Sequence, residues 1–281
     1  MESVIIKPKN ELLKKYVQYF LFFRKPDAGF LSYSTFPNNN LCLAIYKENK
    51  IDYKRNSESN NCTVTPGDTG FKSRLFGFHK MPFHVDVKAS LDQICILFQP
   101  GALSVFTSEP YDDLLGADNV FDVFRRKNDF FLEQIFEEEN LFSRADMLEK
   151  LLLANLKERQ PEKLKEALVL IARAGEQNPS IETLAKKLGM SSPTLFRLFK
   201  NNVGMNPKSY IKTHRFRNIL NEVLQGQQAL TRIAHDNLYY DQAHFIKDFK
   251  SFSGYSPNQL LQKISIEQND LAWIYNNENR R

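Results

Sequence analysis

The sequence predicts a two-domain α+β chain, with a β-rich N-terminal domain, a helical bridge and an all-α C-terminal domain. Three observations support this fold class. Short apolar and aromatic runs separated by turn-forming residues occupy the first 115 residues, whereas apolar residues recur at helical spacing from residue 128 onward. A nine-residue pattern then occurs twice, which indicates a duplicated helical unit. We therefore expect a β-rich domain at 1–127, a bridge at 128–160, a double helical domain at 161–263 and a tail at 264–281.

The N-terminal domain has the sequence pattern of antiparallel strands. Runs rich in aromatic and β-branched residues lie at Val17–Phe23, Leu41–Tyr46 and Gln93–Phe98, with turn-forming residues at 37–40 and 65–68. The pattern predicts a sandwich or a barrel, and a barrel of this size can enclose one small ligand. The candidate pocket residues, for which a place in the core is the alternative, are Phe76, Phe78, Phe83 and Phe98.

The N-terminal domain has few residues that could form a catalytic or metal-binding motif. His79 and His84 are five residues apart, so one helical face cannot present both, and we expect loop or strand histidines rather than metal ligands. The sequence contains no Ser-His-Asp order, phosphate-binding Gly loop or spaced carboxylate pair. We therefore predict no catalytic residue, no metal and no cofactor, and a protein that is not an enzyme.

The sequence also indicates a compartment. The N-terminus lacks the basic start and long apolar run of a signal peptide, and no stretch approaches eighteen apolar residues. The three cysteines have neither CxxC spacing nor an even number, which favours a reducing environment. We expect a cytoplasmic protein without a membrane partner.

The bridge is predicted to contain two helices. Apolar residues recur at helical spacing, and Ser143 is able to cap the second helix. The apolar stripe of Leu141 to Leu156 is wide enough to pack on the N-terminal domain and also on a second subunit, which makes a homodimer possible. Pro161 can start the next helix, from Glu162 to Ala174.

The repeated pattern of the C-terminal domain is F-K-x-x-x-G-x-x-P, which begins at Phe199 and again at Phe249. Each copy follows an apolar-Ala pair, a turn and a short apolar stripe, which is the arrangement of a helix-turn-helix unit. In the first unit Ser180 and Ser191 are good N-caps, and Gly189 suits a turn that needs a positive φ. The second helix of such a unit presents polar and basic groups that suit a DNA major groove.

A single helix is predicted between the two units. The segment from Pro207 to Leu224 carries apolar residues at helical spacing and no internal Gly or Pro. Eighteen residues at about 1.5 Å each give roughly 27 Å. Neighbouring half-sites on DNA lie about 34 Å apart, so this rod permits one chain to read two major-groove segments.

The order and spacing of these residues, over roughly Leu164 to Lys263, resemble the AraC/XylS family of bacterial transcription regulators. The residues that carry the resemblance include Leu184, Ala185, Gly189, Arg197, Phe199, Lys200, Gly204, Tyr210, Arg215, Ile233, Ala234, Asp241, Phe245, Phe249, Gly254 and Pro257. The resemblance implies sequence-specific control of transcription, with double-stranded promoter DNA as the partner and RNA polymerase as a further possible partner. It also implies a cupin-like sensory domain at the N-terminus, where a small-molecule effector would bind.

The same resemblance implies which side chains touch DNA. The base-reading positions fall on Pro193, Thr194, Phe196 and Arg197 in the first recognition helix and on Gln242, Ala243, His244, Ile246 and Lys247 in the second. The candidates for phosphate contacts, which position the protein without specifying a sequence, are Ser191, Lys200, Lys208, Lys212 and Lys250. Arg197 and Gln242 are the strongest candidates for base contacts.

The second unit departs from the family pattern at its turn. Leu238 stands where the family usually has Gly, and the polar Asn237 stands where an apolar residue is expected. Because Leu resists a positive φ, we expect this turn to be strained or rebuilt. A non-specific DNA-binding protein with a degenerate second unit is therefore one alternative, and an N-terminal cupin-like enzyme that the C-terminal domain targets to DNA is another.

The charge distribution favours DNA as the partner of the C-terminal domain. Residues 161–263 contain 15 Lys or Arg against 8 Asp or Glu, whereas the rest of the chain has 23 and 25. The positive charge is thus concentrated where the repeats are, which indicates a polyanionic partner. The tail beyond them carries Leu271, Trp273, Ile274 and Tyr275, which could dock on the domains.

Overall fold

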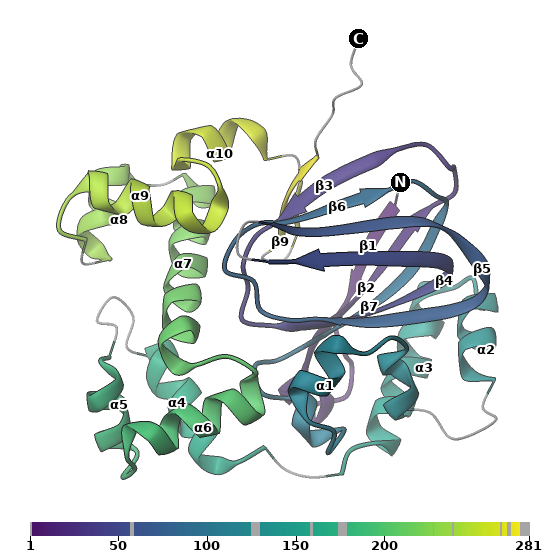
Figure 1. Ribbon diagram of the computed structural model, residues 1–281, viewed down its shortest axis with the longest axis horizontal. Helices are drawn as coiled ribbons and strands as arrows, with labels where there is room; N and C mark the ends of the chain where they lie inside the picture. The colour runs from purple at the N-terminus through teal and green to yellow at the C-terminus, as the bar shows by residue number, and fades with distance from the viewer. Residues whose placement is uncertain are drawn as a thin grey trace.

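The computed structural model describes residues 2–56, 59–124, 130–157, 160–173, 179–226, 228–237, 239–264, 266–268 and 271–275. A strongly bent sheet, called the half-barrel below, lies beside a column of helices (Figure 1). The predicted division into a β-rich N-terminal part and a helical C-terminal part is confirmed. Among the described helices, none is long and apolar enough to cross a membrane.

The half-barrel consists of seven strands from the N-terminal part. They are β1 (Glu2–Ile6), β2 (Val17–Lys25), β3 (Leu31–Thr35), β4 (Leu41–Arg55), β5 (Asn60–Phe76), β6 (Phe83–Val87) and β7 (Leu91–Phe98). Their order in the sheet is β1-β2-β7-β4-β5-β6-β3, and only the β5–β6 pair is parallel. The sheet bends within the long β4–β5 hairpin, where the register shifts between Lys47 and Asn49 and Glu48 has a φ of 56°.

The half-barrel has two cores because side chains of a strand alternate between the faces of a sheet. On β2, Phe20 and Phe22 point to the first core, whereas Tyr19, Leu21 and Phe23 point to the second. The first core continues through the bridge helices into the first helix-turn-helix unit. The second core surrounds a cavity inside the half-barrel.

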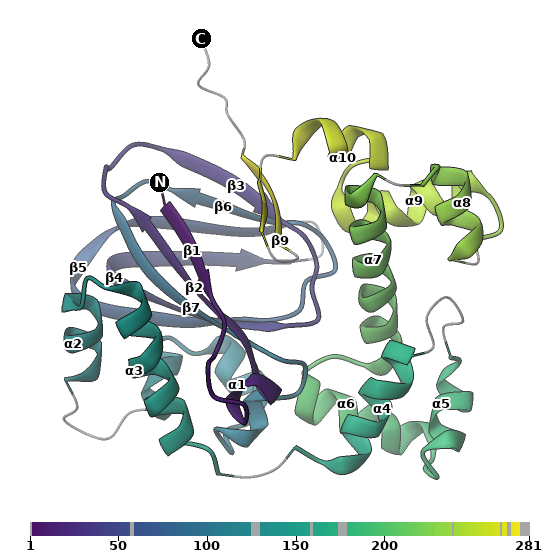
Figure 2. The same ribbon diagram turned by 180° about the vertical axis from the view of Figure 1, so that it is seen from behind.

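Helices that follow β7 in the sequence cover one end of the half-barrel (Figure 2). They are η2 (Leu103–Val105), α1 (Tyr111–Gly116), η3 (Val120–Phe124), α2 (Phe131–Glu137) and α3 (Leu141–Ala154). A single 3-10 turn, η1 (Leu13–Lys15), lies between β1 and β2. The prediction that Ser143 caps α3 is wrong. Asn140 is the N-cap, and its side chain accepts hydrogen bonds from the backbone N–H groups of Phe142 and Ser143.

The helical C-terminal part contains the predicted double unit. Its helices are α4 (Glu162–Arg173), α5 (Ile181–Lys187), α6 (Ser192–Val203), α7 (Pro207–Gln225), α8 (Leu230–Asp236), α9 (Gln242–Ser253) and α10 (Pro257–Lys263). The continuous helix that the sequence predicts between the two units is α7. The predicted end of α4 at Ala174 lies outside the described residues, and the helix is described to Arg173.

The tail returns to the N-terminal half. Strand β8 (Ile266–Gln268) and strand β9 (Leu271–Tyr275) form a hairpin, and β9 pairs antiparallel with β3. The buried side chain of Ile274 packs in a third core, which contains the apolar residues of the second unit together with Phe36 of the half-barrel. The tail therefore connects the second unit to the half-barrel at the sheet edge (Figure 1).

Candidate nucleic-acid interface

The first helix-turn-helix unit is built by local signals that the sequence carries. The side chain of Ser180 accepts from the backbone N–H of Thr183, and Gly189 takes a φ of 65° in the turn between α5 and α6. Leu195 and Phe199 of α6 are completely buried, which fixes the side of the helix that faces the core. The opposite side is left to the solvent.

The residues predicted to read bases from α6 lie together on that exposed side. Pro193, Thr194, Phe196 and Arg197 are all exposed, and the Phe196 ring has 49% of its surface accessible. Exposure of this apolar surface to water is unfavourable, and contact with a base would bury it. These side chains occupy the first two turns of α6, the part of a recognition helix that reaches base edges.

The second unit presents its predicted residues in a similar way. Gln242, Ala243, His244 and Lys247 are exposed on α9, and the side chain of Asp241 caps the helix by accepting from the backbone N–H of His244. Ile246 differs, because it is half-buried and packs against the third core. Ile246 is therefore the least accessible of the nine base-contact candidates.

The turn of the second unit contains a buried polar residue whose side chain forms hydrogen bonds. Asn237 is buried, and its side-chain amide donates to the carbonyl oxygen of Ile233 at 3.0 Å and to the Glu222 carboxylate at 3.2 Å. Its φ of −94° is ordinary for a residue at a helix C-terminus. Leu238, for which strain was predicted, lies outside the described residues.

A network that the sequence did not reveal fixes α9 to α7. Arg215 of α7 donates to the Asp248 carboxylate of α9 at 2.9 Å, and the Tyr239 hydroxyl donates to the same oxygen at 2.6 Å. The Arg215 guanidinium also lies 4.6 Å from the centre of the Tyr239 ring, within cation–π range. Burial raises the pKa of the Tyr239 hydroxyl, so it remains a hydrogen-bond donor. Arg215 is one of the residues that carry the family resemblance, and this resemblance is the sequence signal that could have pointed to it.

The five candidates for phosphate contacts are in different environments. Lys208, Lys212 and Lys250 are exposed. The Ser191 hydroxyl accepts from the backbone N–H of Thr194 and so caps α6. Lys200 forms an ion pair at 3.0 Å with Asp112 of α1, a helix of the N-terminal part.

Close packing joins the first unit to the N-terminal part. The Tyr111 ring of α1 lies against Gly204, the residue that ends α6 with a φ of 80°. A Cβ atom at position 204 would lie 2.1 Å from this ring, so the contact requires glycine. The Asn39 side chain also donates to the carbonyl oxygen of Tyr210 in α7, at 3.4 Å.

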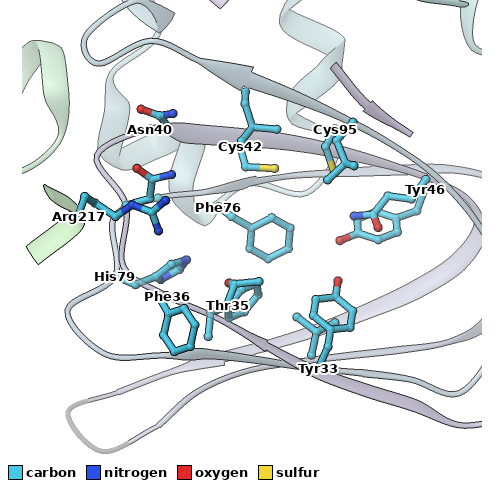
Figure 3. Close-up of a pocket in the computed structure, with 17 residues that line it drawn as sticks. Tyr33, Thr35, Phe36, Asn40, Cys42, Tyr46, Phe76, His79, Cys95 and Arg217 are labelled. Atoms are coloured by element: carbon cyan, nitrogen blue, oxygen red, sulfur yellow. The ribbon is translucent and has the colours of Figure 1, made fainter. Parts of the chain in front are cut away.

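A cavity of about 130 Å³ lies inside the half-barrel (Figure 3). Two of the four predicted pocket residues, Phe76 and Phe83, line it. Phe98 does not line it, because Phe98 points to the first core and packs against Phe106 and Phe124. Phe78 also lies elsewhere, stacked on Tyr111 beside the first unit.

Polar groups line the same cavity. Figure 3 shows His79 and Arg217 at one end, and Arg217 comes from α7, so both halves of the chain bound the cavity. Burial, and secondarily the charge of Arg55, lowers the pKa of His79 to about 3, so its imidazole is neutral. His79 lies in the loop before β6 and His84 within β6, as predicted, and no group of His, Cys, Asp and Glu that could hold a metal ion occurs among the described residues.

The C-terminal part of the chain is similar in sequence to known proteins. Residues 184–263 match the family model of a helix-turn-helix domain. A curated transcriptional regulator of the helix-turn-helix type from Haemophilus influenzae, itself uncharacterized, is 31% identical over 107 residues, which cover 38% of this chain and 36% of that protein. The XylDLEGF operon transcriptional activator of Pseudomonas putida is 30% identical over 95 residues, 33% of this chain and 30% of its own length.

One of the similar solved structures is a transcriptional regulator with an AraC-type DNA-binding domain from Chromobacterium violaceum. It is 24% identical, covers 36% of this chain and 90% of its own chain, and has a TM-score of 0.34. This chain spans about a third of the length of the two curated relatives. Residues 184–263 are therefore a helix-turn-helix domain, as the repeated sequence pattern predicts.

Proposed function

We propose that this protein is a sequence-specific transcription regulator of the AraC/XylS type, which reads two adjacent major-groove segments of promoter DNA with α6 and α9. One observation carries the proposal. The two recognition helices lie near opposite ends of the single helix α7 and are held there by buried contacts (Figure 1). Nineteen residues of helix span about 28 Å, which is close to the separation of neighbouring half-sites on DNA.

The exposed side chains support specific reading. Arg197 can bind guanine O6 and N7 in a bidentate contact, and Gln242 can do the same with adenine N6 and N7. Lys208, Lys212 and Lys250 are exposed cations that suit phosphates, and contacts to phosphate orient a protein on the duplex. As a bacterial transcription regulator, the protein would act in the cytoplasm, with RNA polymerase as a further partner.

The experiment is a selection of bound duplexes from a random DNA library with the full chain. The expected result is a motif with two blocks about one helical turn apart, since α7 fixes the separation of α6 and α9. One block alone would mean that α9 acts only as an electrostatic clamp. Absence of any motif would refute specific reading and favour the non-specific alternative.

The half-barrel would regulate this binding through a small effector. The cavity of about 130 Å³ is close to the size that holds a single-ring compound, and Arg217 of α7 places the DNA-binding half at its edge. Filling the cavity with Val85→Phe should abolish any effect of single-ring compounds on operator affinity and leave basal binding intact. An effect that persists in Val85→Phe would place the effector elsewhere.

A homodimer is also part of the proposal. Phe130 at the start of α2 and Phe142 in the first turn of α3 are large apolar side chains that are mostly exposed. Burying them against a second subunit would remove this apolar surface from water. Sedimentation equilibrium of the wild type and of a Phe130→Ser, Phe142→Ser variant tests this, and a monomeric wild type would refute it.

A further inference from the structure

A hollow of about 240 Å³ lies between the half-barrel and the first recognition helix. Arg55 at the end of β4 and Lys80 in the loop before β6 line it on one side, and Phe196 and Lys200 of α6 line it on the other. Tyr111 of α1 also lines the hollow. Cations of the N-terminal half thus lie beside a side chain that is a candidate for reading bases.

The hollow is continuous with the recognition surface. Phe196 separates it from a second hollow, which Pro193, Arg197 and Lys208 line. With Phe196 itself, three base-reading candidates and one phosphate candidate therefore line the second hollow. Phe196 and Lys200 are one helical turn apart, so the first hollow follows the same flank of α6 toward its C-terminus.

The charge of this flank is positive. Arg55, Lys80 and Lys200 are all exposed, and Asp112 offsets one of these charges through its ion pair with Lys200. The charge of Arg55 also acts on a neighbouring side chain. Burial raises the pKa of Tyr53, and the positive charge of Arg55 opposes that rise. Two half-barrel cations therefore lie next to a third from the recognition helix.

Groove dimensions determine what would meet these cations. A helix with its side chains is about 10–12 Å wide and the major groove is about 12 Å wide, so the phosphates of both groove walls lie close to the helix flanks. A cation just outside the flank of α6 is therefore at the level of a phosphate wall. Arg is suited to this position, because its planar fork binds a phosphate with two parallel hydrogen bonds.

We propose that the N-terminal half-barrel contributes to DNA binding, with Arg55 and Lys80 contacting the phosphate backbone beside the first recognition helix. This inference rests on the proposed function, because it takes α6 to lie in the major groove. The DNA-binding surface of the first unit then spans both halves of the chain. Movement of the half-barrel relative to α6 would remove these contacts, so the state of the N-terminal half would alter affinity directly.

The test compares two double variants of the full chain, each with two cations removed. Arg55→Ala with Lys80→Ala removes the cations of the hollow. Lys50→Ala with Lys72→Ala removes two exposed cations of β4 and β5 that do not line the hollow, and Lys72 follows Phe71, which stacks on Phe136 of α2. Far-UV circular dichroism and the thermal midpoint check that both variants fold as the wild type does.

The measurement is the slope of log K against log salt concentration, on the selected operator and on a random duplex. Each lost phosphate contact flattens the slope by about 0.9, so the Arg55, Lys80 variant should flatten it by about 1.8 on both duplexes, and the control should keep the wild-type slope. The conservative Arg55→Lys, Lys80→Arg variant keeps both charges and should restore most of the wild-type slope.

An unchanged slope in the Arg55, Lys80 variant would overturn the inference. The proposed function fails by a different result, namely equal affinity of the wild type for operator and random duplex. The slope comparison remains valid on any duplex, so the two failures are distinguishable.

Discussion

Arg197 is the residue on which we expect specific reading by the first unit to depend most. It is exposed in the second turn of α6, on the side opposite the buried Leu195 and Phe199. Because the core residues fix the rotation of α6, the guanidinium is directed away from the protein. A planar group held in this way can select one base pair.

We expect Arg197→Ala to lose discrimination at one base pair of the operator, by about 1 to 3 kcal/mol. The physical reason is the loss of a bidentate contact to guanine. Competition binding with single-base variants of the operator measures this. Arg232→Ala, which removes an exposed arginine of α8, is the control and should keep the discrimination. Equal weakening on every duplex would instead make Arg197 a phosphate contact.

His79 predicts a pH dependence of stability. Burial lowers the pKa of His79 to about 3 from its usual 6.5. Below pH 6.5 the unfolded chain binds a proton that the folded chain does not, so the free energy of unfolding falls as the pH falls. The slope is about 1.4 kcal/mol per pH unit down to pH 3, or about 2 kcal/mol lost by pH 5.

Urea unfolding of His79→Phe between pH 7.5 and pH 4.5 tests this. The variant keeps an aromatic ring against Phe83 and should show a shallower decline than the wild type. Part of the decline should remain, because burial also lowers the pKa of His84 and His214. His235→Phe, at an exposed site on α8, is the control, and an identical decline in all three proteins would contradict the prediction.

At the scale of elements, Arg144 fixes helix α3 to the sheet. Its side chain is 1% exposed and donates two hydrogen bonds to the Asp92 carboxylate of β7, at 2.8 and 2.9 Å. It also donates to the carbonyl oxygens of Phe136 and Glu138 at the end of α2. One guanidinium thus joins α2, α3 and the half-barrel.

We expect Arg144→Met to lower the free energy of unfolding by about 3 kcal/mol, because Asp92 loses both of its hydrogen bonds from Arg144 in a partly buried site. The matched control is Arg24→Met. Arg24 lies 3.9 Å from the same carboxylate and is 28% exposed, so its loss should cost less than about 1 kcal/mol. Denaturant unfolding gives both values, and equal costs would show that Arg144 does not hold α3.

In the whole molecule, three of the contacts between the DNA-binding part and the half-barrel differ in kind. Tyr111 packs on Gly204, the Lys200–Asp112 ion pair joins α6 to α1, and β9 pairs with β3. The ion pair is the contact most directly opposed to DNA binding. A phosphate and Asp112 would compete for the same ammonium group of Lys200.

We expect Asp112→Asn to raise DNA affinity about two- to five-fold at low salt, the modest effect of an exposed ion pair. Asp113→Asn removes the same charge from the next position of α1 and is the control for long-range repulsion. Fluorescence anisotropy with a labelled operator measures both. Equal gains in the two variants would attribute the effect to net charge rather than to the release of Lys200.

Features that depend on neighbours along the chain could be predicted from the amino-acid sequence. The repeat at Phe199 and Phe249, the cap at Ser180 and the helix from Pro207 follow from local backbone preferences and helical spacing, so they could be predicted. The N-cap of α3 is Asn140 and not the predicted Ser143, because two residues near the start of this helix are able to cap it.

Tertiary structure decided what depends on residues far apart in the chain. Strand alternation separates Phe98 from Cys95 and Leu97 on β7, but only the bend of the sheet determines that Cys95 and Leu97 face the cavity. Nothing local to Lys200 indicates Asp112, 88 residues earlier, and nothing local to Arg144 indicates Asp92. Packing brings these charges together, because long-range contacts are set by the folded core and not by the pattern of one segment.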